Sequence, residues 1–126
     1  MKPNQFSFQQ RLRSFRFAFN GIISFLRKEH NAWIHLLATI VVITLGFITN
    51  VSSGEWLALL LAIALVWMSE MFNTCIEKLI DFVSTDRHPS LKFIKDVSAG
   101  AVLVCAIISM VIGLIIFIPH LNLFNE

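Results

Sequence analysis

Residues 56–81, WLALLLAIALVWMSEMFNTCIEKLID, decide the fold because they join a purely apolar run to a polar one without a break. Residues 56–69 contain no ionisable side chain, but they are too few to cross a bilayer, which takes about 20 helical residues. No glycine or proline interrupts the chain from 55 to 84, and its Leu, Ala, Ile and Met content favours helix. We therefore predict one spanning helix over about 55–84 that carries carboxylates.

Two further apolar segments flank this helix. Residues 32–49 contain His35 as their one ionisable side chain, and residues 97–118 contain no charge. Apolar residues make up 56% of the chain and charged residues 14%, with a mean hydropathy of +0.75. A soluble domain carries about 25% charged residues, so a soluble globular protein is excluded. We predict an all-α membrane protein, a single domain over 1–126, with spans at about 32–50, 55–84 and 95–118.

The segment before the first span has the pattern of an amphipathic helix. Apolar side chains recur at spacings of three and four, while basic side chains fall between them. This pattern predicts a surface helix over about 7–28, with its basic residues toward anionic lipid headgroups. A soluble helix packed on a partner protein is the alternative. The apolar positions are Phe8, Leu12, Phe15, Phe19, Ile22 and Leu26.

The placement of Lys and Arg predicts the orientation. Six of the ten lie before residue 32, the connection 84–94 carries Arg87 and Lys92, and neither 50–54 nor the tail after Pro119 carries any. Positive side chains stay on the cytoplasmic side, so we expect the N-terminus in the cytoplasm and the C-terminus outside. The net charge of +2 is too small to indicate nucleic acid as a partner.

Polar side chains on 70–81 share one helix face. At 1.5 Å per residue from the outer interface, Glu70 lies about 22 Å down and Glu77 about 33 Å down, in a core about 30 Å thick. A carboxylate inside the core costs a few kcal/mol or more, so we expect Glu70 to face protein, water or a partner and to be functional. The members of this polar ladder, at i, i+3, i+4, i+7 and i+11, are Glu70, Asn73, Thr74, Glu77 and Asp81.

Other charged groups fall at the same cytoplasmic depth. Carboxylates there offer hard oxygen ligands to magnesium, and cations there can meet phosphate oxygens. The small residues at 98–101 let another helix approach closely. The carboxylates are Glu29, Glu77 and Asp96, and the cations are Arg87, His88 and Lys95.

Each of these groups also has a purely structural interpretation. Glu77 can form an interfacial ion pair with Lys78 or Lys95, and the pair 95–96 can serve snorkelling and capping at a helix end. Asn73 and its neighbour can be interhelical contacts. We expect His30 and His35 to be interfacial or packing groups rather than metal ligands.

The ladder resembles a family signature. Residues 70–81, EMFNTCIEKLID, resemble ExxNTAIExxxD of the small integral-membrane prokaryotic diacylglycerol kinases and undecaprenol kinases, with Cys75 in place of Ala. The Lys-Asp pair at 95–96, Gly21 and Glu29 follow the family's order, over roughly residues 11–118. The resemblance implies a homotrimer in the bacterial cytoplasmic membrane, with an N-terminal surface helix and three spans per subunit. It also implies active sites shared between subunits, which transfer the γ-phosphate of ATP to a lipid hydroxyl.

The resemblance also implies roles for single residues. Glu70 would be the general base and, with Ala99, would contact the lipid substrate. Glu29 and Glu77 would hold Mg²⁺. Phe17 stands where the family can have Tyr, and Gln10 stands where a member has Arg. The implied nucleotide-binding residues are Phe17, Glu29, Asn73, Glu77, Asp86, Arg87, His88, Lys95 and Asp96.

The expected acceptor is diacylglycerol, which gives phosphatidic acid, and undecaprenol is the alternative. The segment 30–35, HNAWIH, is similar to the Gram-positive branch of the family, whose members favour undecaprenol. Apolar side chains discriminate lipid tails weakly, so both remain open. A proton- or ion-conducting small membrane subunit is the alternative from another class, because intramembrane carboxylates also form proton paths. Such a conduit would need neither magnesium nor ATP.

Overall fold

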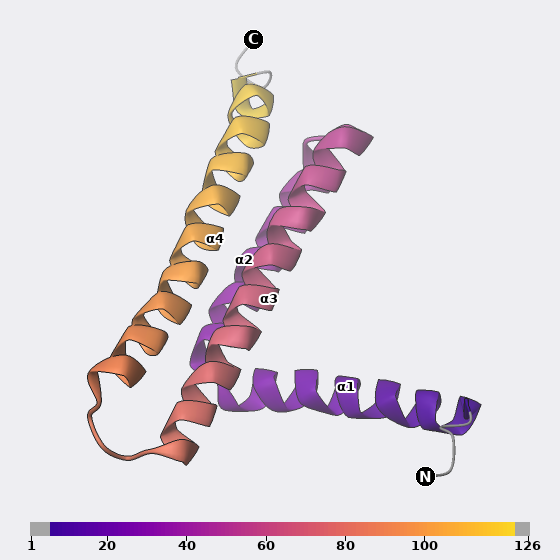
Figure 1. The fold of residues 1–126 in the computed structure, drawn as a ribbon. Helices are drawn as coiled ribbons and strands as arrows, with labels where there is room; N and C mark the ends of the chain where they lie inside the picture. Colours follow the sequence, from indigo (N-terminus) through magenta and orange to yellow (C-terminus); the bar gives the residue numbers. More distant parts are fainter. Residues whose placement is uncertain (1–5, 123–126) are drawn as a thin grey trace. The chain divides into compact units, whose positions relative to one another are not determined.

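The computed structural model describes residues 6–122, and its regular structure over this range is entirely helical (Figure 1). Three of the four helices in that range are long and apolar enough to cross a membrane, by length and composition. The predicted all-α class with three apolar spans is therefore confirmed. The helices are α1 (Phe8–Lys28), α2 (His30–Ile48), α3 (Ser53–Val83) and α4 (Pro89–Asn122).

The chain divides into two compact units, Met1–Ile34 and His35–Glu126. The first unit contains α1, whose first turn is capped by the Ser7 hydroxyl, which accepts from the Gln10 N–H at 3.4 Å. Arg27 and Lys28 occupy the last turn, where cations offset the negative end of the helix dipole. Phenylalanine side chains along α1 are exposed, Phe8, Phe15, Phe17 and Phe19 among them.

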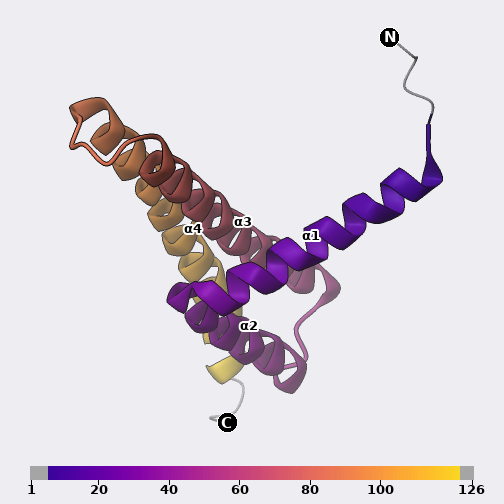
Figure 2. The ribbon, with the colours of Figure 1, turned by 90° about the horizontal axis from the view of Figure 1, so that it is seen from below.

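The second unit is built on α3 and α4, which run antiparallel and lie side by side in both views (Figures 1 and 2). A capping box fixes the start of α3: the Glu55 N–H donates to the Ser52 hydroxyl at 3.2 Å, and the Ser52 N–H donates to the Glu55 carboxylate at 2.8 Å. The last helix starts at Pro89, since proline suits the first helical position, and the predicted span of about 95–118 lies within it.

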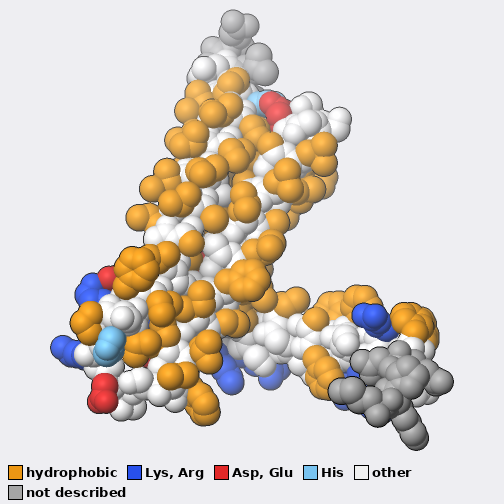
Figure 3. Space-filling view, in the orientation of Figure 1, with side chains coloured by type: hydrophobic (Ala, Val, Ile, Leu, Met, Phe, Trp, Pro, Cys, Tyr) orange, Lys and Arg blue, Asp and Glu red, His pale blue; other side chains and the backbone are white. Residues whose placement is uncertain are grey.

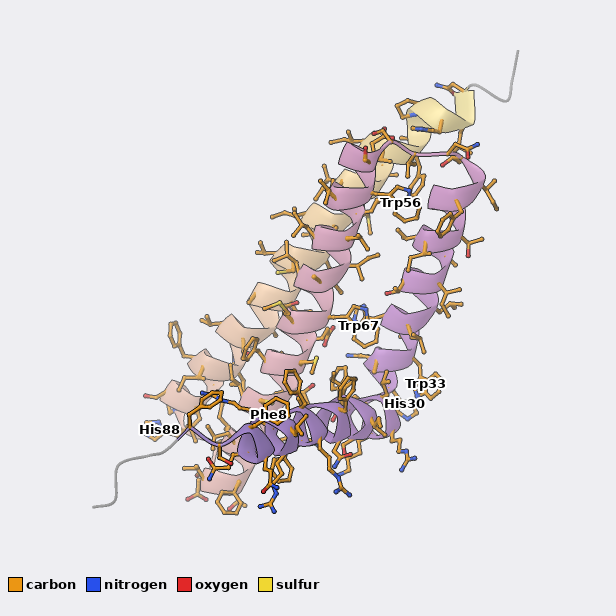
Figure 4. The ribbon with its side chains drawn as sticks, turned by 90° about the vertical axis from the view of Figure 1, so that its right-hand side faces the viewer. Phe8, His30, Trp33, Trp56, Trp67 and His88 are labelled. Atoms are coloured by element: carbon orange, nitrogen blue, oxygen red, sulfur yellow. The ribbon has the colours of Figure 1, made fainter. Side chains whose placement is uncertain are left out.

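The turn between α2 and α3 closes tightly. Asn50 adopts a left-handed conformation with φ of 51°, and the Val51 N–H donates to the Gly46 carbonyl at 3.2 Å. This pattern ends a helix with a residue that tolerates positive φ. Trp56 then folds back over α2, with its ring centroid 4.9 Å from that of Phe47 (Figure 4). Val51 is buried beside Leu59 and Ile116 at this end of the unit.

Most apolar side chains of the long helices remain exposed. Figure 3 shows hydrophobic side chains covering the visible face of α3 and α4. Leu57, Leu103 and Ile115, for example, are each at least 60% exposed. A protein in water would bury such a surface, whereas lipid tails cover it at no cost. This surface agrees with an integral membrane protein.

Gly46 is the one glycine at which an added side chain would collide with neighbouring atoms. This contact leads to a prediction. A Cβ at Gly46 would lie 2.6 Å from Cη2 of Trp56. We expect Gly46→Ala to lower the free energy of unfolding by about 1–3 kcal/mol through overpacking. The matched control is Gly113→Ala on α4, where an added Cβ meets nothing within 4 Å. Detergent unfolding followed by circular dichroism measures both, and equal midpoints would contradict the prediction.

Candidate active site

Glu70 is the buried carboxylate of α3. The residue is 7% exposed, and its Oε1 lies 2.8 Å from Nε2 of His35 on α2. A charged or polar group in an apolar environment needs a hydrogen-bonding partner, and His35 supplies one. The first predicted member of the ladder therefore faces protein, in contact with a neighbouring helix.

A small polar layer surrounds this pair. The Trp67 indole N–H donates to the Thr39 hydroxyl at 2.9 Å, and that hydroxyl donates to the His35 carbonyl at 2.7 Å. The rings of His35 and Trp67 meet edge to face, with centroids 6.4 Å apart and planes at 63°. Figure 4 shows Trp67 projecting from α3 toward α2. These contacts join two residues of α2, His35 and Thr39, to two residues of α3, Trp67 and Glu70.

Asn73, the next member of the ladder, contacts α4 instead. The Ser98 hydroxyl, itself buried, donates to the Asn73 side-chain oxygen at 2.8 Å. Because this bond occupies the oxygen, the Asn73 amide presents its N–H donors elsewhere. Both residues line a mostly apolar groove of about 420 Å³ between α3 and α4.

Charged side chains gather where α3 and α4 are joined. Figure 3 shows cationic, acidic and histidine side chains at that end of the hairpin, where they border a hollow of about 770 Å³. Lys95 Nζ lies 2.7 Å from the Asp81 carboxylate, and Lys92 pairs with Asp96. These pairs are largely exposed, so they orient side chains rather than add much stability. The predicted nucleotide-binding residues on this hollow are Asp86, Arg87, His88, Lys95 and Asp96.

Local bonds shape the connecting loop. The Ser84 hydroxyl accepts from the Asp86 N–H at 3.1 Å, and Nδ1 of His88 accepts from the Ser90 N–H at 3.2 Å. His88, labelled in Figure 4, is the last residue of this loop before α4. Short side chains that bond to nearby backbone N–H groups stabilise turns of this kind.

The remaining predicted residues lie outside this hollow. Phe17 and Glu29 belong to the first unit, where Phe17 is 70% exposed and the Glu29 N–H caps α1 by donating to the Phe25 carbonyl at 3.0 Å. Glu77 and Ala99 are exposed on α3 and α4. Lys95, which was considered as an ion-pair partner of Glu77, lies 2.7 Å from the Asp81 carboxylate instead.

The residues fit a bound Mg²⁺ by their donor chemistry. Within residues 6–122, no three His, Cys, Asp or Glu side chains gather as a complete metal cluster. Magnesium at phosphate-transfer sites does not need one, because it is held by one or two carboxylates together with substrate phosphates and water. Glu77, exposed on α3, offers a carboxylate that could serve in this way.

Sequence reasoning missed two functional candidates. We expected His35 to be an interfacial or packing group, and the structure shows its ring in contact with Glu70. We expected Ser98 only to let another helix approach closely, and its hydroxyl also donates to Asn73. The signal for His35 was available, since it is the one ionisable side chain of the first apolar segment. No comparable signal marks Ser98.

Fold and site together define a helical membrane protein with a buried carboxylate on α3 and a charged hollow where α3 and α4 are joined. Residues 16–117 match the family described as prokaryotic diacylglycerol kinase. An undecaprenol kinase of Bacillus subtilis is 40% identical over 109 residues, which cover 86% of this chain and 89% of that protein. The chain therefore belongs to the prokaryotic diacylglycerol kinase family, as its signature indicated, and it is a lipid kinase.

Two diacylglycerol kinases are also similar to the chain. The protein of Synechocystis is 32% identical over 111 residues, or 87% of this chain and 63% of that protein. The protein of Pseudomonas aeruginosa is 30% identical over 105 residues, or 80% of this chain and 85% of that protein. Relatives with both acceptor names thus align with most of the chain.

The bond between Ser98 and Asn73 generates a prediction for activity. We expect Ser98→Ala to lower kcat/KM for phosphate transfer from ATP by about fivefold, because a net hydrogen bond contributes about 1 kcal/mol and Asn73 would lose its orientation. The matched control is Ser109→Ala, since the Ser109 hydroxyl also joins α4 to α3, bonding to the Ala62 carbonyl at 3.1 Å. Equal kcat/KM values for the two variants would refute a role of Ser98 at the site.

Proposed function

We propose that the chain transfers the γ-phosphate of ATP to the hydroxyl of a membrane lipid, with Glu70 as general base. The observation that carries this proposal is the family match over residues 16–117, which includes the whole polar ladder of α3. The burial of Glu70 supports it, because a carboxylate in an apolar span without a function would only cost stability.

The reaction balances as a direct displacement. The lipid hydroxyl oxygen forms a bond to the γ-phosphorus, and its proton passes to the Glu70 carboxylate. The bond from that phosphorus to the bridging oxygen breaks, and ADP leaves with the electron pair. Phosphoryl transfer asks a protein mainly to position the reactants and neutralise charge, so no separate nucleotide domain is needed.

The nucleotide phosphates would occupy the charged hollow at the end of the hairpin. Arg87, His88 and Lys95 would meet phosphate oxygens, and the contact with Asp81 holds Lys95 in place for this task. Asp86 and Asp96 would bind other polar groups of ATP. We assign Asn73 to this site, and we keep Phe17 as a nucleotide contact on the strength of the family resemblance alone.

Glu29 and Glu77 are the proposed Mg²⁺ ligands. When bound, the ion would offset the negative charge of the ATP phosphates. The two carboxylates supply the hard oxygen ligands that magnesium prefers. Both assignments come from the positions these residues hold in the family pattern.

Undecaprenol is the acceptor that the relatives favour. The undecaprenol kinase of Bacillus subtilis is 40% identical to this chain, against 32% and 30% for the two diacylglycerol kinases. Diacylglycerol, the acceptor expected from the sequence, is the second candidate because both lipids present a hydroxyl at the membrane interface. Ala99, exposed on α4, has a small side chain that would leave room for the hydroxyl end of either lipid.

We further propose that the enzyme is a homotrimer in the bacterial inner membrane with active sites shared between subunits. The N-terminus and the α3–α4 loop would face the cytoplasm, where ATP is available, and the C-terminus would lie outside. The basic residues and exposed phenylalanines of α1 suit a helix at the membrane surface. The exposed apolar surface of the long helices leaves room for subunit contacts as well as lipid.

The first test is phosphate transfer from radiolabelled ATP by the purified chain in mixed micelles. Undecaprenol and diacylglycerol are compared side by side, with magnesium and with a chelator. We expect magnesium-dependent product, with undecaprenol the better acceptor by kcat/KM. No product with either lipid, from protein with an intact helical spectrum, would contradict the proposed function and revive an ion-conducting role.

The second test concerns the base. We expect Glu70→Gln to lower kcat by at least about 100-fold, because the amide cannot accept the hydroxyl proton and general-base catalysis contributes 10²–10⁴-fold. Glu55→Gln is the matched control, since Glu55 starts the same helix and glutamine preserves its capping box. Near-normal turnover by the Glu70 variant in assembled protein would remove the base assignment.

A further inference from the structure

We infer that His35 is a positioning residue for the phosphoryl transfer: it holds one oxygen of the Glu70 carboxylate and leaves the other to take the proton of the lipid hydroxyl. The inference rests on the proposed function, but it adds a residue from a different helix to that site. His35 lies on α2 and Glu70 on α3, and the two atoms in contact are 2.8 Å apart.

The two oxygens of Glu70 differ in their surroundings. Among the described residues, the hydrogen bond of this carboxylate is made at Oε1, by the ring of His35. In the same part of the chain, no fully buried side-chain oxygen or nitrogen lacks a hydrogen-bond partner. Oε2 is therefore not fully buried, and the side chain as a whole is 9% exposed. We infer that the reacting hydroxyl reaches the carboxylate at this oxygen.

The ring of His35 is itself held in place. Thr39 donates to the His35 carbonyl one turn later and accepts from the indole of Trp67, whose ring also meets the imidazole edge to face. The imidazole is 19% exposed, so it has little room to turn away. Thr39 and Trp67 thus hold the imidazole of His35 in place, and the imidazole in turn holds the carboxylate of Glu70.

This arrangement has a consequence for the reaction. A glutamate side chain rotates about several bonds, and each rotamer points its oxygens differently. When Nε2–H of His35 donates to Oε1, that oxygen is held in place and Oε2 points in one direction. The lipid proton then passes to Oε2, and the hydrogen bond at Oε1 stays in place. Misplacing a reacting group by about 1 Å can cost about 100-fold in rate, so the hydrogen bond is expected to act on kcat.

Substitution of His35 separates positioning from packing. His35→Leu keeps bulk and removes the donor, whereas the side-chain N–H of His35→Gln can take the place of Nε2–H. We expect His35→Leu to lower kcat about 10- to 100-fold with the KM for ATP unchanged, and His35→Gln to recover most of that loss. His120→Leu is the matched control, because His120 and Glu55 also form a histidine–glutamate pair between two helices, at 3.6 Å. It should leave kcat unchanged.

A spectroscopic readout accompanies the kinetics. In the full chain labelled with ¹⁵N-histidine, we expect the His35 resonance of a ring protonated at Nε2, shifted by Glu70→Gln. Unchanged kcat in His35→Leu, equal loss in both His35 variants, or a mere drop in stability with normal kcat per folded protein would each overturn the inference. Failure of the proposed function looks different, since the unsubstituted chain would then form no lipid phosphate with either acceptor.

Discussion

The burial of one carboxylate in an apolar helix is the constraint on which the rest of the structure depends. Glu70 cannot face lipid tails without a cost of a few kcal/mol or more, so α3 must turn its polar face toward other helices. His35 on α2 meets that carboxylate, and Ser98 on α4 meets Asn73 three residues later. The polar face of α3 thus makes hydrogen bonds to both other helices of the second unit.

The polar side chains of α3 become more exposed toward the α3–α4 loop. Glu70 is buried, Asn73 half-buried and Glu77 exposed, and Asp81 pairs with Lys95 at the surface. A lipid hydroxyl and the phosphates of ATP have opposite solubilities, and this gradient would suit both within a few turns of one helix. With the proposed orientation, the membrane would present one substrate and the cytoplasm the other, so no dedicated nucleotide domain would be needed.

The sequence predicts the helices and the polar ladder well because both depend on local spacing. Apolar run lengths indicate three spans, and the intervals from Glu70 to Asp81 place these residues on one face whatever the tertiary structure. The contacts of His35 and Ser98 could not be predicted in this way. Their partners lie 35 and 25 residues away, and only helix packing brings them together. The start of α4 at Pro89, by contrast, follows from a local signal, because proline suits the first helical position.

The difference between local spacing and helix packing also explains why the lipid acceptor is harder to predict than the reaction. The reaction depends on polar groups, which are few, costly to bury and therefore conspicuous in an apolar sequence. The lipid tail meets apolar side chains of many kinds, and a methylene more or less changes binding by only about 1–3 kcal/mol. Relatives named for two different acceptors accordingly both match most of this chain. Specificity would then lie in how much room the helices leave beside the hydroxyl, a property of packing that residue spacing does not encode.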